Sequence, residues 1–130
     1  MTLTIEIPLP SRACSPNTYK HWRTRGRGAK ELREWAFMAA MEKNAPMMQA
    51  PVRVSHTWYM AKRGPDDCYR PIDAGNAQAS LKAAIDGLVD AKLIPGDNHK
   101  QLKWGECRLY RTAKEHKGKC GVVLTLEPLA

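Results

Sequence analysis

The sequence lacks a hydrophobic run that approaches the roughly 18–20 residues of a membrane-spanning helix. Its first residues, MTLTIEIPLP, contain no basic segment followed by a long apolar stretch, so we expect no secretion signal. A GxxxxGKS/T phosphate loop, a GxGxxG fingerprint and an HExxH metalloprotease motif are also absent. These absences argue against a membrane protein, a secreted protein, a common nucleotide-binding enzyme and a zinc protease. We expect a cytoplasmic protein.

Cysteine is sparse, and its spacing argues against a structural zinc site. The four cysteines form no CxxC pair, and the four histidines are equally scattered, so neither set suits a zinc ribbon or finger. We expect the thiols to be reduced, as is usual in the cytoplasm. The cysteines are Cys14, Cys68, Cys107 and Cys120.

The sequence has an excess of positively charged residues. Its 130 residues are 43% hydrophobic and 26% charged, which is the balance of a globular protein and suits one domain over residues 1–130. Lysine and arginine number 21 against 13 acidic residues, giving a net charge of +8. A surface of this sign favours a polyanionic partner. The small core makes help from a partner subunit plausible.

The hydrophobic periodicity predicts an α+β fold in the order β-α-β-α-β-β, with two main helices on one small mixed sheet. Residues 120–127 have the β-branched content of a buried strand, and the basic turn KEHKGK predicts a hairpin between the last two strands. The predicted elements are a strand at 2–8, a loop at 11–30, a helix from 29 to 43, a strand at 52–60, a helix at 77–91, and strands at 101–111 and 120–127.

The predicted loop at 11–30 is basic and contains no acidic residue. Arginine guanidinium groups can form two parallel hydrogen bonds to phosphate oxygens, and two glycines give the backbone of such a loop conformational freedom. This segment is therefore a candidate for binding the DNA backbone. The alternative is a solvated basic loop. Its aromatic residues, Tyr19 and Trp22, could stack on an unpaired base or be buried in the core or a dimer interface. The DNA-binding candidates are Lys20, Arg23, Arg25, Arg27, Lys30 and, farther along, Arg70.

A second constellation contains three acids and one lysine. Asp73 precedes the second predicted helix, Asp97 follows it, and Lys82 and Asp86 lie four residues apart on one helix face. Carboxylates at the edge of a basic protein are ligands that Mg²⁺ prefers, and a nearby ammonium can neutralise developing charge. The alternative is purely structural: Asp73 caps the helix, Lys82 and Asp86 form a surface ion pair, and Asp97 belongs to a turn.

The length of the predicted helix sets a condition on this site. A 15-residue helix spans about 22 Å, so Asp73 and Asp97 begin at opposite ends of it. They can meet only if the helix is shorter than its pattern suggests, or if residues 73–78 fold back along it. His99, beside Asp97, is more typical of a surface side chain than of a metal ligand.

Three motifs together resemble the RusA family of Holliday junction resolvases, particularly its phage and actinobacterial members. The family carries a D-x-D-N run, then an LKAA-x-DGLVDA-like helix and an acidic turn. Here these stand as DAGN at 73–76, LKAAIDGLVDA at 81–91 and LIPGDN at 93–98. The N-terminal part also matches the family. The family's first strand, which ends in prolines, corresponds to IPLP at 7–10. Its S-P-N motif corresponds to SPN at 15–17, and its His-Trp pair corresponds to residues 21–22. The resemblance covers nearly the whole chain.

The resemblance implies a homodimeric, Mg²⁺-dependent endonuclease that cuts four-way DNA junctions, with Mn²⁺ as a substitute ion, in a bacterial or phage-infected cytoplasm. It implies Asp73, Lys82 and Asp97 as catalytic residues. The implied metal ligands are Asp73, Asp97 and, with a less defined role, Asp86.

Departures from the family pattern leave alternatives open. Gly75 replaces the second Asp of D-x-D-N, Gly96 replaces one acid of the turn, and Ala77 replaces the usual Leu. Removing a carboxylate weakens both ion binding and transition-state stabilisation. A catalytically impaired DNA-structure-binding protein is therefore an alternative function, and a phage protein-interaction module is another.

Overall fold

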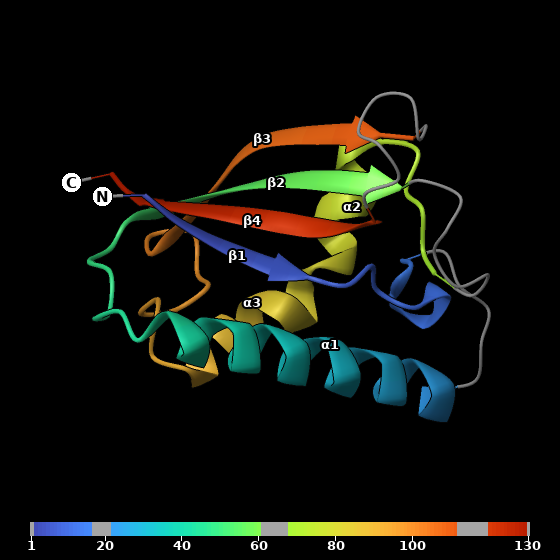
Figure 1. Ribbon diagram of the computed structural model, residues 1–130, viewed down its shortest axis with the longest axis horizontal. Helices are drawn as coiled ribbons and strands as arrows, with labels where there is room; N and C mark the ends of the chain where they lie inside the picture. Colours follow the sequence, from blue (N-terminus) through green and yellow to red (C-terminus); the bar gives the residue numbers. More distant parts are fainter. Residues whose placement is uncertain (1, 17–21, 61–67, 112–119, 130) are drawn as a thin grey trace.

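The computed structural model describes residues 2–16, 22–60, 68–111 and 120–129 (Figure 1). It is an α+β structure with a four-stranded mixed sheet, which confirms the predicted class. The elements are β1 (Leu3–Ile7), the 3-10 helix η1 (Arg12–Cys14), α1 (Trp22–Lys43), β2 (Val52–Met60), α2 (Ala74–Ser80), α3 (Lys82–Asp90), β3 (Leu102–Tyr110) and β4 (Cys120–Pro128).

The sheet has the strand order β1-β4-β2-β3. β4 is antiparallel to both β1 and β2, and β2 and β3 are parallel because the helices α2 and α3 provide the crossover between them. The predicted hairpin between the last two strands is therefore wrong, since β2 lies between them. The turn KEHKGK itself lies outside the described residues.

Burial explains why β4 pairs with β2. The inward side chains of β2 alternate strictly along the strand, and opposite them on β4 lie three buried apolar residues. These core-facing pairs stabilise a register that sequence proximity alone could not reveal. The pairs are Val54 with Leu126, His56 with Leu124 and Trp58 with Val122.

The core includes one polar contact, between His56 and Trp58. Both side chains are almost fully buried, and Trp58 Nε1 donates a hydrogen bond of 2.9 Å to His56 Nδ1. The acceptor atom must be unprotonated, so this bond requires a neutral imidazole with its proton on Nε2. Burial lowers the pKa of His56 to about 4, which is consistent with that state.

Helix α1 begins earlier than its sequence suggests. Residues 22–30 were predicted as loop, but they form the first turns of α1. The prediction was wrong because Gly26 and Gly28 are typical of a loop. Gly28 lies where η1 packs on the helix, and a Cβ there would be 2.8 Å from Ser11 Oγ and 2.9 Å from Ala13 Cβ. This glycine permits close packing rather than a flexible loop. The predicted end is confirmed, because the helix ends at Lys43 and Asn44 adopts a left-handed φ of 48°.

The second predicted helix is in fact two helices. The helix is interrupted at Leu81, whose ψ of 3° is not helical. Helix α2 therefore ends at Ser80, and α3 begins at Lys82. The predicted buried stripe is confirmed: Leu81, Ala84, Ile85 and Leu88 are all at most 1% exposed. The periodicity was therefore correct, but it could not reveal the kink between the two segments.

Helices α1 and α3 lie side by side beneath the sheet in Figure 1. The two helices pack closely at Gly87, where a Cβ would clash with Arg33 O and lie 3.0 Å from both Ala36 Cβ and Phe37 N. Among the described residues, no helix is long and apolar enough to cross a bilayer.

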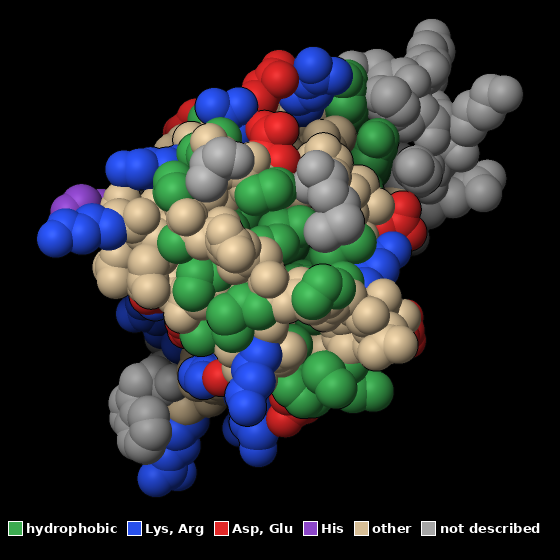
Figure 2. Space-filling view, turned by 90° about the vertical axis from the view of Figure 1, so that its left-hand side faces the viewer, with side chains coloured by type: hydrophobic (Ala, Val, Ile, Leu, Met, Phe, Trp, Pro, Cys, Tyr) green, Lys and Arg blue, Asp and Glu red, His purple; other side chains and the backbone are tan. Residues whose placement is uncertain are grey.

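Hydrophobic side chains also gather on one end of the molecule, shown facing the viewer in Figure 2. This is the end at which α1 stops, and Met41 and Met47 are 55% and 49% exposed there. Leu129 is 38% exposed, and its N–H donates to Pro51 O, which holds it beside the segment that follows α1. We call Met41, Met47 and Leu129 the apolar end.

Candidate functional site

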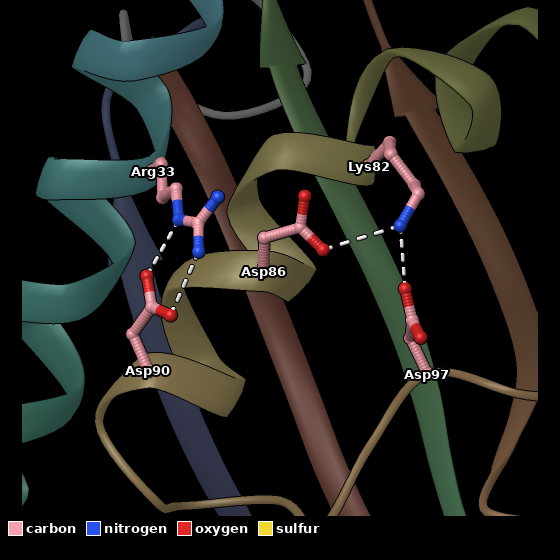
Figure 3. A network of polar contacts seen from close by, with 5 residues as sticks. All are labelled: Arg33, Lys82, Asp86, Asp90 and Asp97. Atoms are coloured by element: carbon pink, nitrogen blue, oxygen red, sulfur yellow. Dashed lines mark hydrogen bonds and ion pairs between the residues drawn. The ribbon is translucent and has the colours of Figure 1, made fainter.

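Lys82 joins two carboxylates that are far apart in the sequence (Figure 3). It is the first residue of α3, and its Nζ donates to Asp86 Oδ1 at 3.1 Å and to Asp97 Oδ2 at 2.5 Å. Asp86 is one turn farther along α3, whereas Asp97 comes from the loop after the helix. We call Lys82, Asp86 and Asp97 the lysine cluster.

Apolar anchoring explains how the loop brings Asp97 back to the start of α3. Lys92 turns the chain with a left-handed φ of 58° after the helix ends. Leu93 and Ile94 are then buried to 2% and 1% exposure, and Met48 N donates to Leu93 O. Because these contacts hold the loop against the body of the protein, it returns along α3 toward Lys82.

The charges of the lysine cluster stabilise one another. The hydrogen bond from Lys82, followed by the charge of Lys82, holds the pKa of Asp97 below its usual value. The hydrogen bonds to Asp97 and then Asp86 raise the pKa of Lys82. The side chains are 69%, 30% and 42% exposed for Lys82, Asp86 and Asp97, so water screens these pairs and a substrate can reach them.

A second ion pair continues the row of charges on α3. Arg33 of α1 donates two hydrogen bonds to Asp90, at 2.5 and 2.8 Å, and this fork joins the two helices (Figure 3). Asp90 follows Asp86 by one helical turn. Because Arg33 holds Asp90, we assign this acid to packing and Asp86 to the candidate site.

Asp73 has a different position. It is the N-cap of α2, with Oδ1 accepting from Asn76 N at 2.8 Å and Oδ2 from Asn76 Nδ2 at 3.1 Å. The seven residues of α2, about 10 Å of helix axis, separate it from Lys82. Within the described part of the chain, no three His, Cys, Asp or Glu side chains are grouped to hold a metal ion. The structure thus brings Asp86 and Asp97 together at Lys82, and Asp73 takes no part in that contact.

The basic start of α1 lies beside the lysine cluster. A cavity of about 350 Å³ is lined by Arg25 and Gly26 of α1, Ala13 and Cys14 of η1, and Lys82 and Asp86 of α3. Arg23, Arg27 and Lys30 belong to the same exposed helical segment. We call this space the Lys82 cavity. It juxtaposes an arginine, a lysine and a carboxylate, which can bind a phosphate group and polarise it.

The remaining sequence candidates have varied positions. Lys20 and Tyr19 lie outside the described residues, as does the side chain of Trp22. Arg70 is partly buried, with Nη1 donating to Cys68 O at 3.4 Å, and His99 is exposed. All four cysteines are free, as predicted.

Sequence reasoning missed the part played by η1. Arg12 and its neighbours were assigned to a loop, yet η1 forms a wall of the Lys82 cavity. The signal for this packing was Gly28, whose missing side chain admits η1. Comparison of the chain with models of known protein families and with curated protein sequences finds no match.

Proposed function

We propose that this protein is a Mg²⁺-dependent endodeoxyribonuclease that binds branched DNA, with four-way junctions as its substrate. One observation carries the proposal: Arg25, from the basic start of α1, lines the Lys82 cavity together with Lys82 and Asp86 of the lysine cluster. A phosphodiester bound by Arg25 would lie against Lys82 and Asp86. The net charge of +8 supports a polyanionic substrate.

The donor set suits a hard divalent ion. Asp86 and Asp97 are partly exposed carboxylates that already share one cation, the Lys82 ammonium. Oxygen ligands of this kind, completed by water and substrate phosphate, are what Mg²⁺ takes. Bound Mg²⁺ would supply charge neutralisation and activation of water. The role of the chain's own residues is to hold the phosphate with Arg25 and to offset leaving-group charge with Lys82.

Asp73 enters the proposal as an additional acid at the start of α2. Its carboxylate caps the helix, and the neighbouring Gly75 lacks the carboxylate that the family pattern carries there. A Cβ on Gly75 would meet only Asp73 Oδ1, at an ordinary 3.5 Å. An aspartate therefore fits at this position without displacing the backbone.

These features also favour a second candidate function, junction binding without efficient cleavage. Both oxygens of Asp73 are engaged by Asn76, and the position of the missing acid is open. On this alternative the protein holds branched DNA through its cations and cuts it slowly or not at all.

A junction cleavage assay with Mg²⁺ and Mn²⁺ separates the two functions. The nuclease requires metal-dependent nicking of a synthetic four-way junction that Asp97→Asn reduces by about 100-fold or more. Glu106→Gln is the matched control, because Glu106 is an exposed acid on β3 paired with Arg108. If cleavage is near zero and Gly75→Asp raises it sharply, the binding function is correct. If the junction is bound no better than linear duplex, both functions are rejected.

We further propose that the active form is a homodimer. A two-fold axis would present two identical Lys82 cavities to a junction that is itself nearly symmetric. The apolar end is a solvent-exposed hydrophobic surface of the kind that a subunit contact buries.

A further inference from the structure

Several described arginines differ in whether an acid neutralises them. Three are neutralised by acids: Arg33 by Asp90, Arg53 by Glu127 and Arg108 by Glu106. Within the described ranges, Arg12 and Arg70 form no such ion pair. Cations without a carboxylate partner are those that a bound anion can neutralise, so Arg12 and Arg70 are candidates for anion binding.

Arg12 and Arg70 line the same cavity, although they are far apart in the sequence. The cavity has a volume of about 300 Å³, and its other lining residues are Ser15, Cys68 and Tyr69. Backbone contacts fix the two segments side by side, since Ser11 and Cys68 form a β-bridge and Tyr69 N donates to Pro10 O at 2.8 Å. The fold itself therefore brings Arg12 and Arg70 to one cavity.

Tyr69 adds a hydroxyl to this cavity. Its ring packs edge-on against the buried Trp58, with centroids 6.3 Å apart, which fixes the position of the phenol. Burial raises the pKa of Tyr69, and the charge of Asp73 adds to the effect despite a hydrogen bond with Ser15 that lowers it. The hydroxyl is consequently protonated at neutral pH and can donate to an anion.

A second cavity shares Arg70 with the first as a lining residue. It has a volume of about 280 Å³ and is lined by Met60, Arg70, Pro71, Ile72 and Arg111. Arg111 Nη2 donates to Ile72 O at 2.6 Å, which holds this guanidinium at the cavity. We call the two cavities together the Arg70 groove, with Arg12, Arg70 and Arg111 along it.

The 3-10 helix η1 separates the Arg70 groove from the Lys82 cavity. Arg12 and Ser15 line the groove, whereas the two residues between them, Ala13 and Cys14, line the Lys82 cavity. Two cation-bearing spaces thus flank one short helix. A duplex carries charge along both strands, with phosphates at regular intervals, so one DNA segment can supply anions to two such spaces.

We propose that the Arg70 groove binds DNA phosphates other than the one in the Lys82 cavity. DNA phosphates would then be bound on both sides of η1. The inference rests on the proposed function, because it takes DNA as the ligand of the Lys82 cavity. It adds Arg12, Tyr69 and Arg111 to the DNA-binding residues and does not depend on hydrolysis.

Anisotropy of a fluorescent four-way junction in EDTA, measured over a range of salt concentrations, tests the groove. Arg12→Ala and Arg70→Ala should each weaken binding about 5- to 10-fold and reduce the slope of log Kd against log salt by about 1. Arg108→Ala removes the same charge from a paired arginine on β3 and should change binding less than twofold. Arg70→Lys, which keeps the charge, should retain most of the affinity.

The outcomes separate this inference from the proposed function. If Arg25→Ala weakens binding but Arg12→Ala and Arg70→Ala do not, the groove is rejected and the Lys82 cavity stands. If the groove variants weaken binding of a junction that the wild type never cuts, the groove stands and the nuclease fails. Inorganic phosphate, followed through the arginine Nε–H signals in NMR, tests a free anion as the ligand. If phosphate shifts the Arg12 and Arg70 signals and no DNA is bound, the DNA assignment is wrong.

Discussion

At the scale of single residues, Lys82 shows what spacing in a sequence can and cannot predict. Its pair with Asp86 follows from the four-residue separation on a helix. Its contact with Asp97 could not be predicted from spacing, because it depends on the burial of Leu93 and Ile94, which brings the loop back along α3. The position of Asp73, beyond α2, depends likewise on the kink at Leu81.

Replacing Lys82 with methionine should change both chemistry and titration. Because the lysine holds the pKa of Asp97 low, the pKa should rise in Lys82→Met, as measured by NMR of the carboxyl carbon. Junction cleavage should fall by about 100-fold or more, since charge on the leaving oxygen loses its cation. Lys100→Met removes an exposed lysine outside the cluster and should leave both quantities unchanged. An unchanged cleavage rate in Lys82→Met would contradict the role given to this residue.

His56 makes the stability of the fold depend on pH. Its pKa is about 4 in the folded chain and about 6.5 when unfolded, so protons bind the unfolded state more strongly between these values. Stability is therefore full above pH 6.5 and is lost as the pH falls toward 4. We expect a loss of about 2 kcal/mol between pH 7.5 and 5, measured by urea unfolding.

The control for this pH effect is His56→Gln, which retains an acceptor for Trp58 Nε1 but does not titrate. This variant should be nearly flat over the same range, since carboxylates stay ionised above pH 5. Parallel curves for the two proteins would show that another group is responsible.

At the scale of elements, the sequence predicts where strands and helices lie better than where helices begin or kink. β2 was correctly predicted because its alternation over Val52–Met60 is uninterrupted. The start of α1 was misplaced because Gly26 and Gly28 have the composition of a loop. A sequence pattern cannot distinguish a glycine that permits flexibility from one that permits a close contact.

Two glycines on packed helices provide a matched test of this distinction. Gly87→Ala introduces a Cβ against Arg33 O, Ala36 and Phe37 at the α1–α3 contact, so the helices must separate. We expect a loss of about 2–3 kcal/mol in the free energy of unfolding. Gly26→Ala meets nothing within 4 Å and should stabilise the chain by about 0.5–1 kcal/mol. Equal effects in thermal unfolding would contradict the close helix contact.

At the scale of the whole molecule, the mixed sheet and its crossover could be predicted, but the strand order could not. Local sequence favours pairing of successive strands, whereas the burial of Val122, Leu124 and Leu126 against β2 decides the partner of β4. The proposed homodimer belongs to this scale as well, since it depends on a surface rather than on any one element.

Charging the apolar end should separate the proposed subunits. We expect the wild type to sediment as a dimer and the double variant Met41→Asp, Met47→Asp to shift toward monomer, because a carboxylate in a closed interface is strongly disfavoured. Thr4→Asp alters an exposed position on the edge strand β1 and serves as control. A monomeric wild type at micromolar concentration would reject the dimer.

The central position of β4 has a consequence for synthesis. The ribosome releases β1, β2 and β3 before the strand that must lie between β1 and β2 has emerged. In a nascent chain that ends before Cys120, the edges of β1 and β2 that pair with β4 have no partner strand. Folding should therefore be completed only after translation of β4, and chains stalled before it should be targets for chaperones or proteases.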